Sequence, residues 1–222
     1  MIFLQVKDHS YCAKILALKI EDYLLQDKKV LWLLSGGSNI AISVEAFNIL
    51  KASIPEKLKD NLAVTLTDER YGPVGHKDSN WQGLLNLGFI MDEVKSAPVL
   101  CGLSEGETTK NFEENYKKLT EWAHVVIGQF GVGSDGHVAG VLPGTYGVSD
   151  PEIADYYVTP QFTRISLTLA TIKKINMALT FALGESKREI IHLLKTQDIP
   201  LAKMPAQILK EIPESYLYSD IL

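Results

Sequence analysis

Four short apolar runs, separated by helix-like segments, limit the folds that this chain can adopt. They lie at Val30–Leu34, Leu62–Leu66, 124–127 and 177–183. Apolar and polar residues do not alternate cleanly within these runs, which is typical of strands covered on both faces. Strands that alternate with helices indicate βαβ units and a mostly parallel sheet. The pattern predicts an α/β fold, a three-layer sandwich with a mostly parallel central sheet, in one domain over residues 1–222.

Three segments between or beside these runs have helical periodicity. They cover residues 10–25, 109–122 and 187–195. Ser10 and Ser186 are candidate N-caps, because a serine hydroxyl can accept from a free N–H of the first turn. Residues 143–160 have little periodicity, and we expect loops there with at most a short helix.

Composition restricts the class of protein and its surroundings. Hydrophobic residues make up 46% of the 222 residues and the formal net charge is −5, which disfavours non-specific nucleic-acid binding. No apolar run reaches the length of a membrane span, and the N-terminus does not resemble a secretory signal. We therefore expect a cytoplasmic protein with no nucleic-acid or membrane partner. The sequence gives no prediction of oligomeric state.

The two cysteines, Cys12 and Cys101, have neither metal-ligand spacing nor a disulfide-framework pattern. We interpret both as buried, inert thiols, since free cysteine is among the residue types most often buried.

Three polar segments each follow one of the apolar runs. Ser-Gly-Gly-Ser occupies residues 35–38, Asp-Glu-Arg occupies 68–70, and Gly-Val-Gly-Ser-Asp-Gly-His occupies 131–137. In open α/β sheets, ligands bind beyond the carboxyl ends of the strands. If the strands are parallel neighbours, the three segments meet at one crevice.

The first segment, 35–38, precedes a predicted helix. Backbone N–H groups and the positive end of the helix dipole suit a phosphate there, and Ser38 and Asn39 could add donors. The alternative is an ordinary tight turn with Ser38 as a helix cap. The segment is not a Walker loop, because no Gly-Lys-Ser/Thr follows.

In the second segment, strand alternation places Asp68 and Arg70 on one side and Glu69 on the other. The alternative is a solvated charged turn. Asp78 and Asn80 follow shortly, and their side chains can fold back as hydrogen-bonding supports for the loop.

The third segment, 131–137, combines a tight glycine turn with Asp135 and His137, two side chains capable of proton chemistry near neutral pH. It also matches the Gly-x-Gly-x-x-Gly pattern of dinucleotide sites. We do not expect a dinucleotide or any other cofactor, because a dinucleotide fold usually carries this turn on its first strand. The spacing of the five histidines argues against a metal site, and His124 is interpreted as structural.

Two further cations stand near strand and helix starts. Arg164 and Lys187 are either surface charges or, together with a glycine turn, sufficient to hold one phosphate dianion.

In this order, the segments resemble the 6-phosphogluconolactonase family, which is related to the glucosamine-6-phosphate deaminases. The matching residues are 34–38, 68–70, 78–80, 131–137, 142–144, 164–168, 184–187 and 205–206, so the resemblance covers nearly the whole chain. Asn39 and Val138 stand where the family usually has threonine, which removes hydroxyls near the substrate. The deaminases have a glutamate where this chain has Val141 and Leu142, which argues against deamination.

The resemblance implies a glucosamine-6-phosphate deaminase or ribose-5-phosphate isomerase-like fold. It also implies hydrolysis of 6-phospho-D-glucono-1,5-lactone in the pentose phosphate pathway. His137 would be the general base, oriented by Asp135 or a backbone carbonyl. Arg70 would stabilise the oxyanion or hold sugar hydroxyls, and Asp68 would bind hydroxyls or order Arg70. The residues expected to hold the phosphate are Gly36, Gly37, Ser38, Asn39, Arg164 and Lys187. The alternatives are an isomerase or deaminase on the same fold and a non-catalytic sugar-phosphate-binding module.

Overall fold

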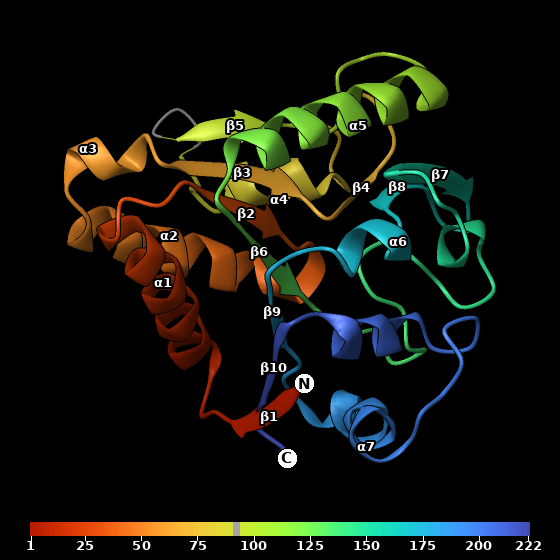
Figure 1. Ribbon diagram of the computed structural model, residues 1–222. Helices are drawn as coiled ribbons and strands as arrows, with labels where there is room; N and C mark the ends of the chain where they lie inside the picture. The colour runs from red at the N-terminus through yellow and green to blue at the C-terminus, as the bar shows by residue number, and fades with distance from the viewer. Residues whose placement is uncertain (91–93) are drawn as a thin grey trace.

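A seven-stranded sheet forms the centre of the computed structural model, which describes residues 1–90 and 94–222 apart from the side chain of Tyr146 (Figure 1). The strands, in spatial order, are β1 (Ile2–Gln5), β10 (Glu214–Ser219), β9 (Met177–Phe181), β6 (Val125–Phe130), β2 (Val30–Leu34), β3 (Leu62–Leu66) and β5 (Lys95–Ala97). Every pairing in this sheet is parallel. The four predicted strands all lie in it, so the prediction of a mostly parallel central sheet is confirmed.

Helices cover both faces of the sheet, which confirms the predicted fold class. On one face lie α1 (His9–Leu25), α2 (Ile40–Ser53) and α4 (Asn80–Asn86), with α2 in contact with the other two. On the other lie α5 (Glu105–Trp122), α6 (Leu169–Ile172) and α7 (Arg188–Thr196), and the short α3 (Glu56–Lys59) precedes β3 (Figure 1). None of the helices in the described part of the chain has the length and hydropathy that a bilayer span requires.

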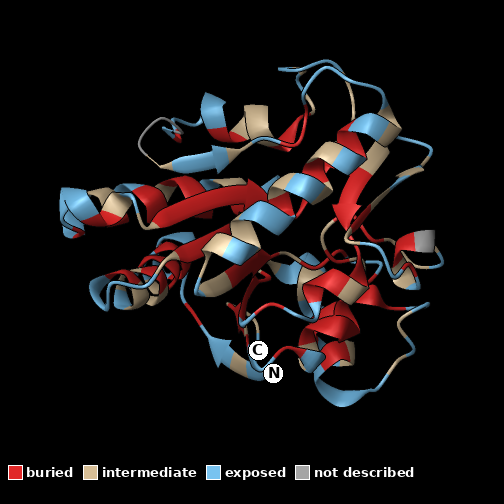
Figure 2. Cartoon of the chain, turned by 45° about the horizontal axis from the view of Figure 1, so that its top comes forward, coloured by how far each residue is buried: buried red, intermediate tan, exposed pale blue. Residues whose placement is uncertain are grey.

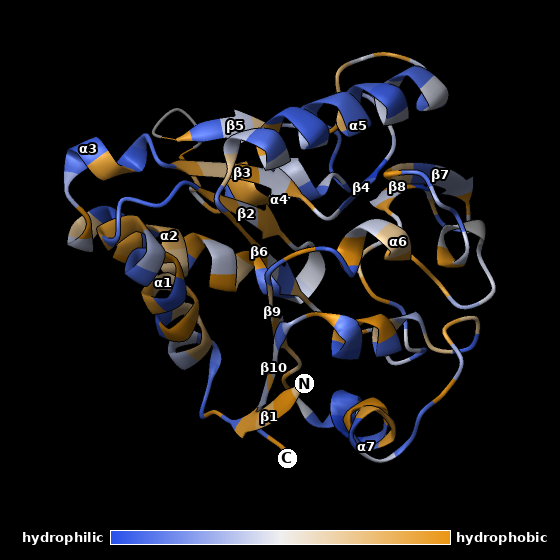
Figure 3. Ribbon diagram, in the orientation of Figure 1, coloured by the Kyte–Doolittle hydropathy of each residue, from blue (hydrophilic) through white to orange (hydrophobic). Residues whose placement is uncertain are grey.

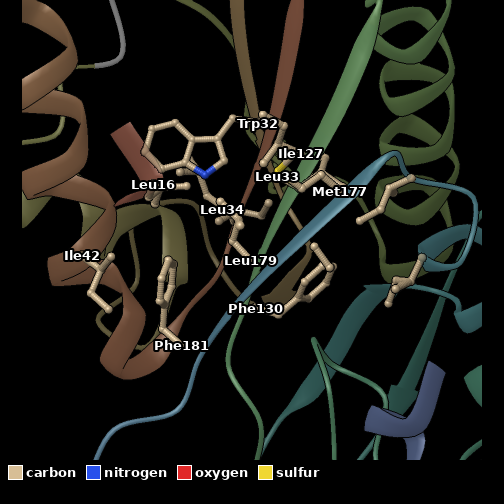
Figure 4. Close-up of a cluster of buried hydrophobic side chains, with 14 of the residues drawn as sticks. Leu16, Trp32, Leu33, Leu34, Ile42, Ile127, Phe130, Met177, Leu179 and Phe181 are labelled. Carbon is tan, nitrogen blue, oxygen red and sulfur yellow. The ribbon is translucent and has the colours of Figure 1, made fainter. Parts of the chain in front are cut away.

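The core lies between the sheet and its helices. All residues of β2, β3 and β9 are buried, so the strands stand out in the buried colour of Figure 2. The close-up in Figure 4 shows Leu16 of α1 and Ile42 of α2 beside this sheet, with Trp32 and Phe130 among the large buried side chains. In contrast to the buried strands, α5 is mostly hydrophilic (Figure 3). It covers the face of the sheet opposite α1 and α2. The absence of clean alternation in the strands therefore reflects burial on both faces.

The starts of α1 and α5 differ from the predicted ones because other side chains cap these helices. Asp8 accepts the Tyr11 N–H at 2.8 Å, so α1 begins before Ser10. Ser104 and Glu107 form a capping box, which starts α5 four residues before 109. Ser186 lies inside the 3-10 turn Glu185–Lys187 and does not cap α7.

A second, antiparallel sheet stands beyond the carboxyl ends of the central strands. Its order is β4 (Asp68–Arg70), β8 (Thr163–Leu167) and β7 (Ala154–Val158). Because β7 falls within residues 143–160, the expectation of loops there is wrong for that strand. The 3-10 turn Tyr146–Val148 accounts for the expected short helix.

Two smaller expectations are settled by burial and hydrogen bonding. Cys12 is buried but Cys101 is exposed, so the interpretation of both as buried thiols is wrong for Cys101. His124 accepts the Lys29 N–H at its Nδ1, 2.9 Å away, and so joins the segments that lead into β2 and β6. That structural contact confirms the interpretation of His124.

Candidate active site

The candidate site lies where the connections of the central sheet diverge. From β2 the chain continues to β3 on one side, whereas from β6 it continues to β9 on the other, and β2 and β6 are neighbours. Such a switch point leaves a crevice at the carboxyl ends of the two strands, where ligands of open α/β sheets bind. A cavity of about 230 Å³ occupies this place. Its lining residues are Ser35, Gly36, Gly37, Ser38, Asn39, Asp68, Arg70, Asn80, Gly131, Val132, Gly133, His137, Ala139, Arg164 and Lys187.

The structure brings the predicted residues together at this cavity. All of them line it except Asp135, whose carboxylate contacts Nδ1 of the His137 ring. A larger hollow of about 670 Å³ lies beside α7 and Leu222, but it is lined by different residues, such as Arg188 and His192. Because the smaller cavity collects three polar segments from separate strands, we take it as the site.

A tight turn after β6 presents the imidazole. The Gly133 N–H donates to the His137 carbonyl at 3.0 Å, and Gly136 takes a φ of 86°, which favours glycine. A side chain at Gly133 would overlap the His137 ring and the Asp135 carboxylate. The turn therefore requires glycine so that His137 can fold back against Asp135.

His137 and Asp135 form a close pair. The ring Nδ1 lies 2.6 Å from Asp135 Oδ1, and the His137 backbone N–H donates to the same oxygen at 3.1 Å. Burial would raise the pKa of Asp135, but these hydrogen bonds and the charge of the ring outweigh it and lower that pKa. The His137 side chain is 32% exposed. With Nδ1 engaged by Asp135, Nε2 is the nitrogen that remains for proton transfer in the cavity.

The second sheet supplies an acid and two arginines. Asp68 is 5% exposed, accepts the Thr67 hydroxyl at 3.0 Å and lies 3.7 Å from the Arg164 guanidinium. Arg70 donates from Nη1 to the Asp78 carbonyl at 2.9 Å. The Nε atoms of both arginines are buried and have no hydrogen-bond partner in the described part of the chain. Both arginines line the cavity, so their positive charge can attract an anion there.

Glu69 points away from the cavity, which confirms the alternation predicted for residues 68–70. It is fully buried, and its carboxylate accepts four hydrogen bonds, from the backbone N–H groups of Arg70, Asn80 and Trp81 and from the Ser79 hydroxyl, at 2.7 to 3.0 Å. Burial raises the pKa of Glu69, and the hydrogen bonds oppose this effect only in part. Glu69 therefore ties β4 to the start of α4.

The loop at 78–80 supports the site largely as expected. Asn80 donates from Nδ2 to the Asp68 carbonyl at 3.0 Å, and its side chain packs so closely against Gly36 that a Cβ there would overlap it. Asp78 contributes its backbone carbonyl to Arg70 instead of its side chain. Through Asn80, the strand that carries Asp68 is joined to the glycine loop after β2.

The glycine loop enters α2 through a 3-10 turn, Gly37–Asn39, in which Gly37 has a φ of 61°. Neither the turn nor α2 has a side-chain cap among the described residues, so the helix start is free to receive an anion. Ser38 is exposed at this point and forms no cap, contrary to the alternative interpretation of the segment.

A buried polar network fixes the loop. The Asn39 carbonyl accepts from Gln129 Nε2 at 3.0 Å and from the Ser43 hydroxyl at 3.2 Å, and Ser43 also contacts Gln129 at 2.8 Å. The Asn39 amide nitrogen faces the Phe181 carbonyl at 3.5 Å. Neither Ser43 nor Gln129 was among the predicted site residues, although each is a polar residue within a mostly apolar helix or strand.

Lys187, Arg70 and Arg164 form a cationic wall along the cavity. Lys187 Nζ donates to the Val132 carbonyl at 2.8 Å, which holds the ammonium group at the cavity beside the glycine turn. With Arg70 and Arg164, the cavity thus has three cationic side chains in a protein whose net charge is −5. Among the described residues, no group of three or more His, Cys, Asp or Glu side chains could hold a metal ion.

Fold and site together define an α/β protein with an open parallel sheet, whose carboxyl edge carries a His–Asp pair and an anion-binding cavity. A family model described as glucosamine-6-phosphate isomerases/6-phosphogluconolactonase matches residues 9–217. The chain belongs to this family.

Individual relatives agree with this assignment. The chain is 29% identical over 173 residues to a 6-phosphogluconolactonase of Caulobacter vibrioides, with 68% of each chain covered. It is 26% identical over 175 residues to one of Neisseria meningitidis, covering 70% of this chain and 73% of that one. In fold, it is similar to a 6-phosphogluconolactonase of Shewanella baltica, with a TM-score of 0.80, 19% identity and coverage of 99% and 97%. A Thermotoga maritima 6-phosphogluconolactonase gives a TM-score of 0.78, 16% identity and coverage of 98% of each chain.

Proposed function

We propose that this protein hydrolyses 6-phospho-D-glucono-1,5-lactone to 6-phosphogluconate, the lactonase reaction of the oxidative pentose phosphate pathway. The observation that carries the proposal is the His137–Asp135 pair, joined at 2.6 Å, in a cavity that also holds Arg70, Arg164 and Lys187. A lactone is an activated ester, so its hydrolysis needs a base for the attacking water and stabilisation of one oxyanion. The curated relatives named 6-phosphogluconolactonase support the same reaction.

In this mechanism, His137 Nε2 takes a proton from water while the water oxygen attacks the lactone carbonyl carbon. Arg70 stabilises the negative charge that develops on the carbonyl oxygen. The ring C–O bond then breaks, and the protonated imidazole returns its proton to the leaving ring oxygen. Asp135 orients the ring through Nδ1 and stabilises its charged form.

The phosphate end of the substrate lies on the cationic wall. The residues proposed to hold it are Gly36, Gly37, Ser38, Asn39, Arg164 and Lys187. The Asp68 carboxylate lies 3.7 Å from the Arg164 guanidinium, so in this proposal it orders Arg164 instead of Arg70, in addition to binding sugar hydroxyls. Asn39 also fixes the loop, through its contacts with Phe181 and Gln129. A cytoplasmic location and a domain spanning residues 1–222 stay predictions.

The test is an assay of freshly prepared lactone, corrected for its spontaneous hydrolysis. His137→Ala is expected to lower kcat by about 10²–10⁴-fold, the usual contribution of a general base, while 6-phosphogluconate still binds. His192→Ala is the matched control, because His192 is an exposed residue of α7 outside the cavity. Full turnover by His137→Ala would remove His137 from the mechanism.

Two other outcomes would redirect the proposal. Release of ammonia from glucosamine 6-phosphate would indicate a deaminase, although Val141, at the place of the deaminase carboxylate, is fully buried and apolar. Binding of 6-phosphogluconate by the wild type without lactone turnover would indicate a non-catalytic binding module.

A further inference from the structure

Phe162 stands at the entrance to β8, outside the residues that line the cavity. Thr159 fixes its main chain in the turn between β7 and β8, through Thr159 N–H to the Phe162 carbonyl at 2.8 Å and Phe162 N–H to the Thr159 hydroxyl at 3.1 Å. Phe162 precedes Arg164 by two residues, so the extended chain presents both side chains on the same side.

The two arginines of the cavity oppose each other. Arg70 and Arg164 are direct partners in the antiparallel pairing of β4 and β8. Like charges in directly opposite positions destabilise a pair of strands. The Asp68 carboxylate, 3.7 Å from Arg164, offsets part of this repulsion, and the Asp78 carbonyl anchors Arg70.

The Phe162 ring contacts both cations. Its centroid lies 5.4 Å from Arg70 Cζ and 5.9 Å from Arg164 Cζ, within the range of a cation–π interaction. One ring therefore attracts two guanidinium groups that repel each other. Among the residues that the structure describes, the buried Nε atom of each arginine has no hydrogen-bond partner.

We propose that Phe162 is a positioning residue that holds Arg70 and Arg164 side by side at the cavity wall in the absence of substrate. The anionic substrate then meets both guanidinium groups already in place and does not have to bring them together. Without the aromatic ring, the two cations would move apart, and part of the binding free energy would be used to reassemble them. This inference rests on the proposed function insofar as the anion is a sugar phosphate.

The experiment compares Phe162→Leu, which keeps an apolar side chain but removes the ring, with Phe162→Tyr, which keeps the ring. Calorimetric titration with 6-phosphogluconate is expected to show about 3- to 30-fold weaker binding by Phe162→Leu, the affinity equivalent of lost cation–π contacts. Phe162→Tyr should bind within about twofold of the wild type by the same reasoning. Inorganic phosphate serves as a second probe, so the inference can be tested even if the wild type proves inactive on the lactone.

Fluorination of the ring separates cation–π attraction from packing. A trifluorophenylalanine at position 162 keeps the shape of the side chain but weakens the negative face of the ring. Affinity should fall with this substitution while the melting temperature stays near that of the wild type. Wild-type affinity in either Phe162→Leu or the fluorinated protein would overturn the proposal, and the fluorinated protein decides the matter if Phe162→Leu does not fold.

Discussion

At the scale of single residues, the site depends on a pair that the sequence placed two positions apart. Asp135 and His137 are separated by Gly136, whose φ of 86° turns the chain so that the carboxylate reaches the ring. Spacing alone did not decide between Asp135 and a backbone carbonyl as the partner of the ring. The geometry favours Asp135, because its oxygen lies 2.6 Å from Nδ1.

We predict that Asp135→Asn lowers kcat for the lactone by about tenfold or more, but by less than the loss of the base itself. The amide cannot stabilise a positively charged imidazole as a carboxylate does. Ser134→Ala is the control, because Ser134 is an exposed neighbour in the same turn. Unchanged kcat in Asp135→Asn would show that another group orients His137.

The same variant has a pH signature. The folded protein lowers the pKa of Asp135, so the stability that this carboxylate contributes is present above its ordinary pKa of about 3.9. That contribution is lost as the pH falls through the lowered pKa of the folded state. The difference in unfolding free energy between wild type and Asp135→Asn should therefore shrink below about pH 4. Denaturant unfolding at several pH values checks this sign.

At the scale of elements, buried polar groups join segments that the sheets alone would leave independent. Glu69 links β4 to α4, and Gln129 links β6 to the loop that precedes α2. Each link places a strand end at a defined position relative to a helix start. These buried polar side chains form hydrogen bonds to neighbouring elements, and the bonds hold the residues around the cavity in position.

Glu69→Gln tests this view. Glutamine has one acceptor oxygen, so its NH2 group would face two of the four donors, and we expect a loss of about 1–3 kcal/mol in unfolding free energy. Glu114→Gln, on the exposed side of α5, should change stability little. Equal stability of Glu69→Gln and wild type, measured by urea unfolding, would contradict the assigned role.

The raised pKa of Glu69 adds a second measurement. A carboxyl whose pKa is higher in the folded state stabilises the protein fully below its unfolded pKa of about 4.3 and loses this contribution as the pH rises through the folded value. The destabilisation caused by Glu69→Gln should therefore be larger in acid than at neutral pH.

At the scale of the whole molecule, the cavity joins the two sheets. Ser38 and His137 follow strands of the parallel sheet, whereas Asp68, Arg70 and Arg164 belong to the antiparallel one. A ligand in the cavity contacts both sheets at once. It should therefore stabilise the folded chain as a unit.

We predict that 6-phosphogluconate at about 100 times its Kd raises the unfolding free energy by about 2.7 kcal/mol. In a chain of this size the melting temperature should rise by about 2–4 °C for each kcal/mol. Gluconate without phosphate is the matched ligand control, and Lys187→Met should reduce the shift by removing one cation from the wall. A melting temperature that rises equally with gluconate would exclude a specific phosphate site.

The parallel core and the chemistry available at its edge could be predicted from the amino-acid residues alone. Continuous apolar runs predicted strands buried on both faces, and the polar residues after them reach one cavity because parallel strands end at the same edge. The antiparallel sheet, the four hydrogen-bond donors around Glu69 and the contact of Phe162 with both arginines are visible only in the folded chain. The antiparallel sheet and the Phe162 contact depend on residues far apart in the chain, such as Arg70 and Arg164, whose pairing is set by packing and leaves no periodic pattern in either segment.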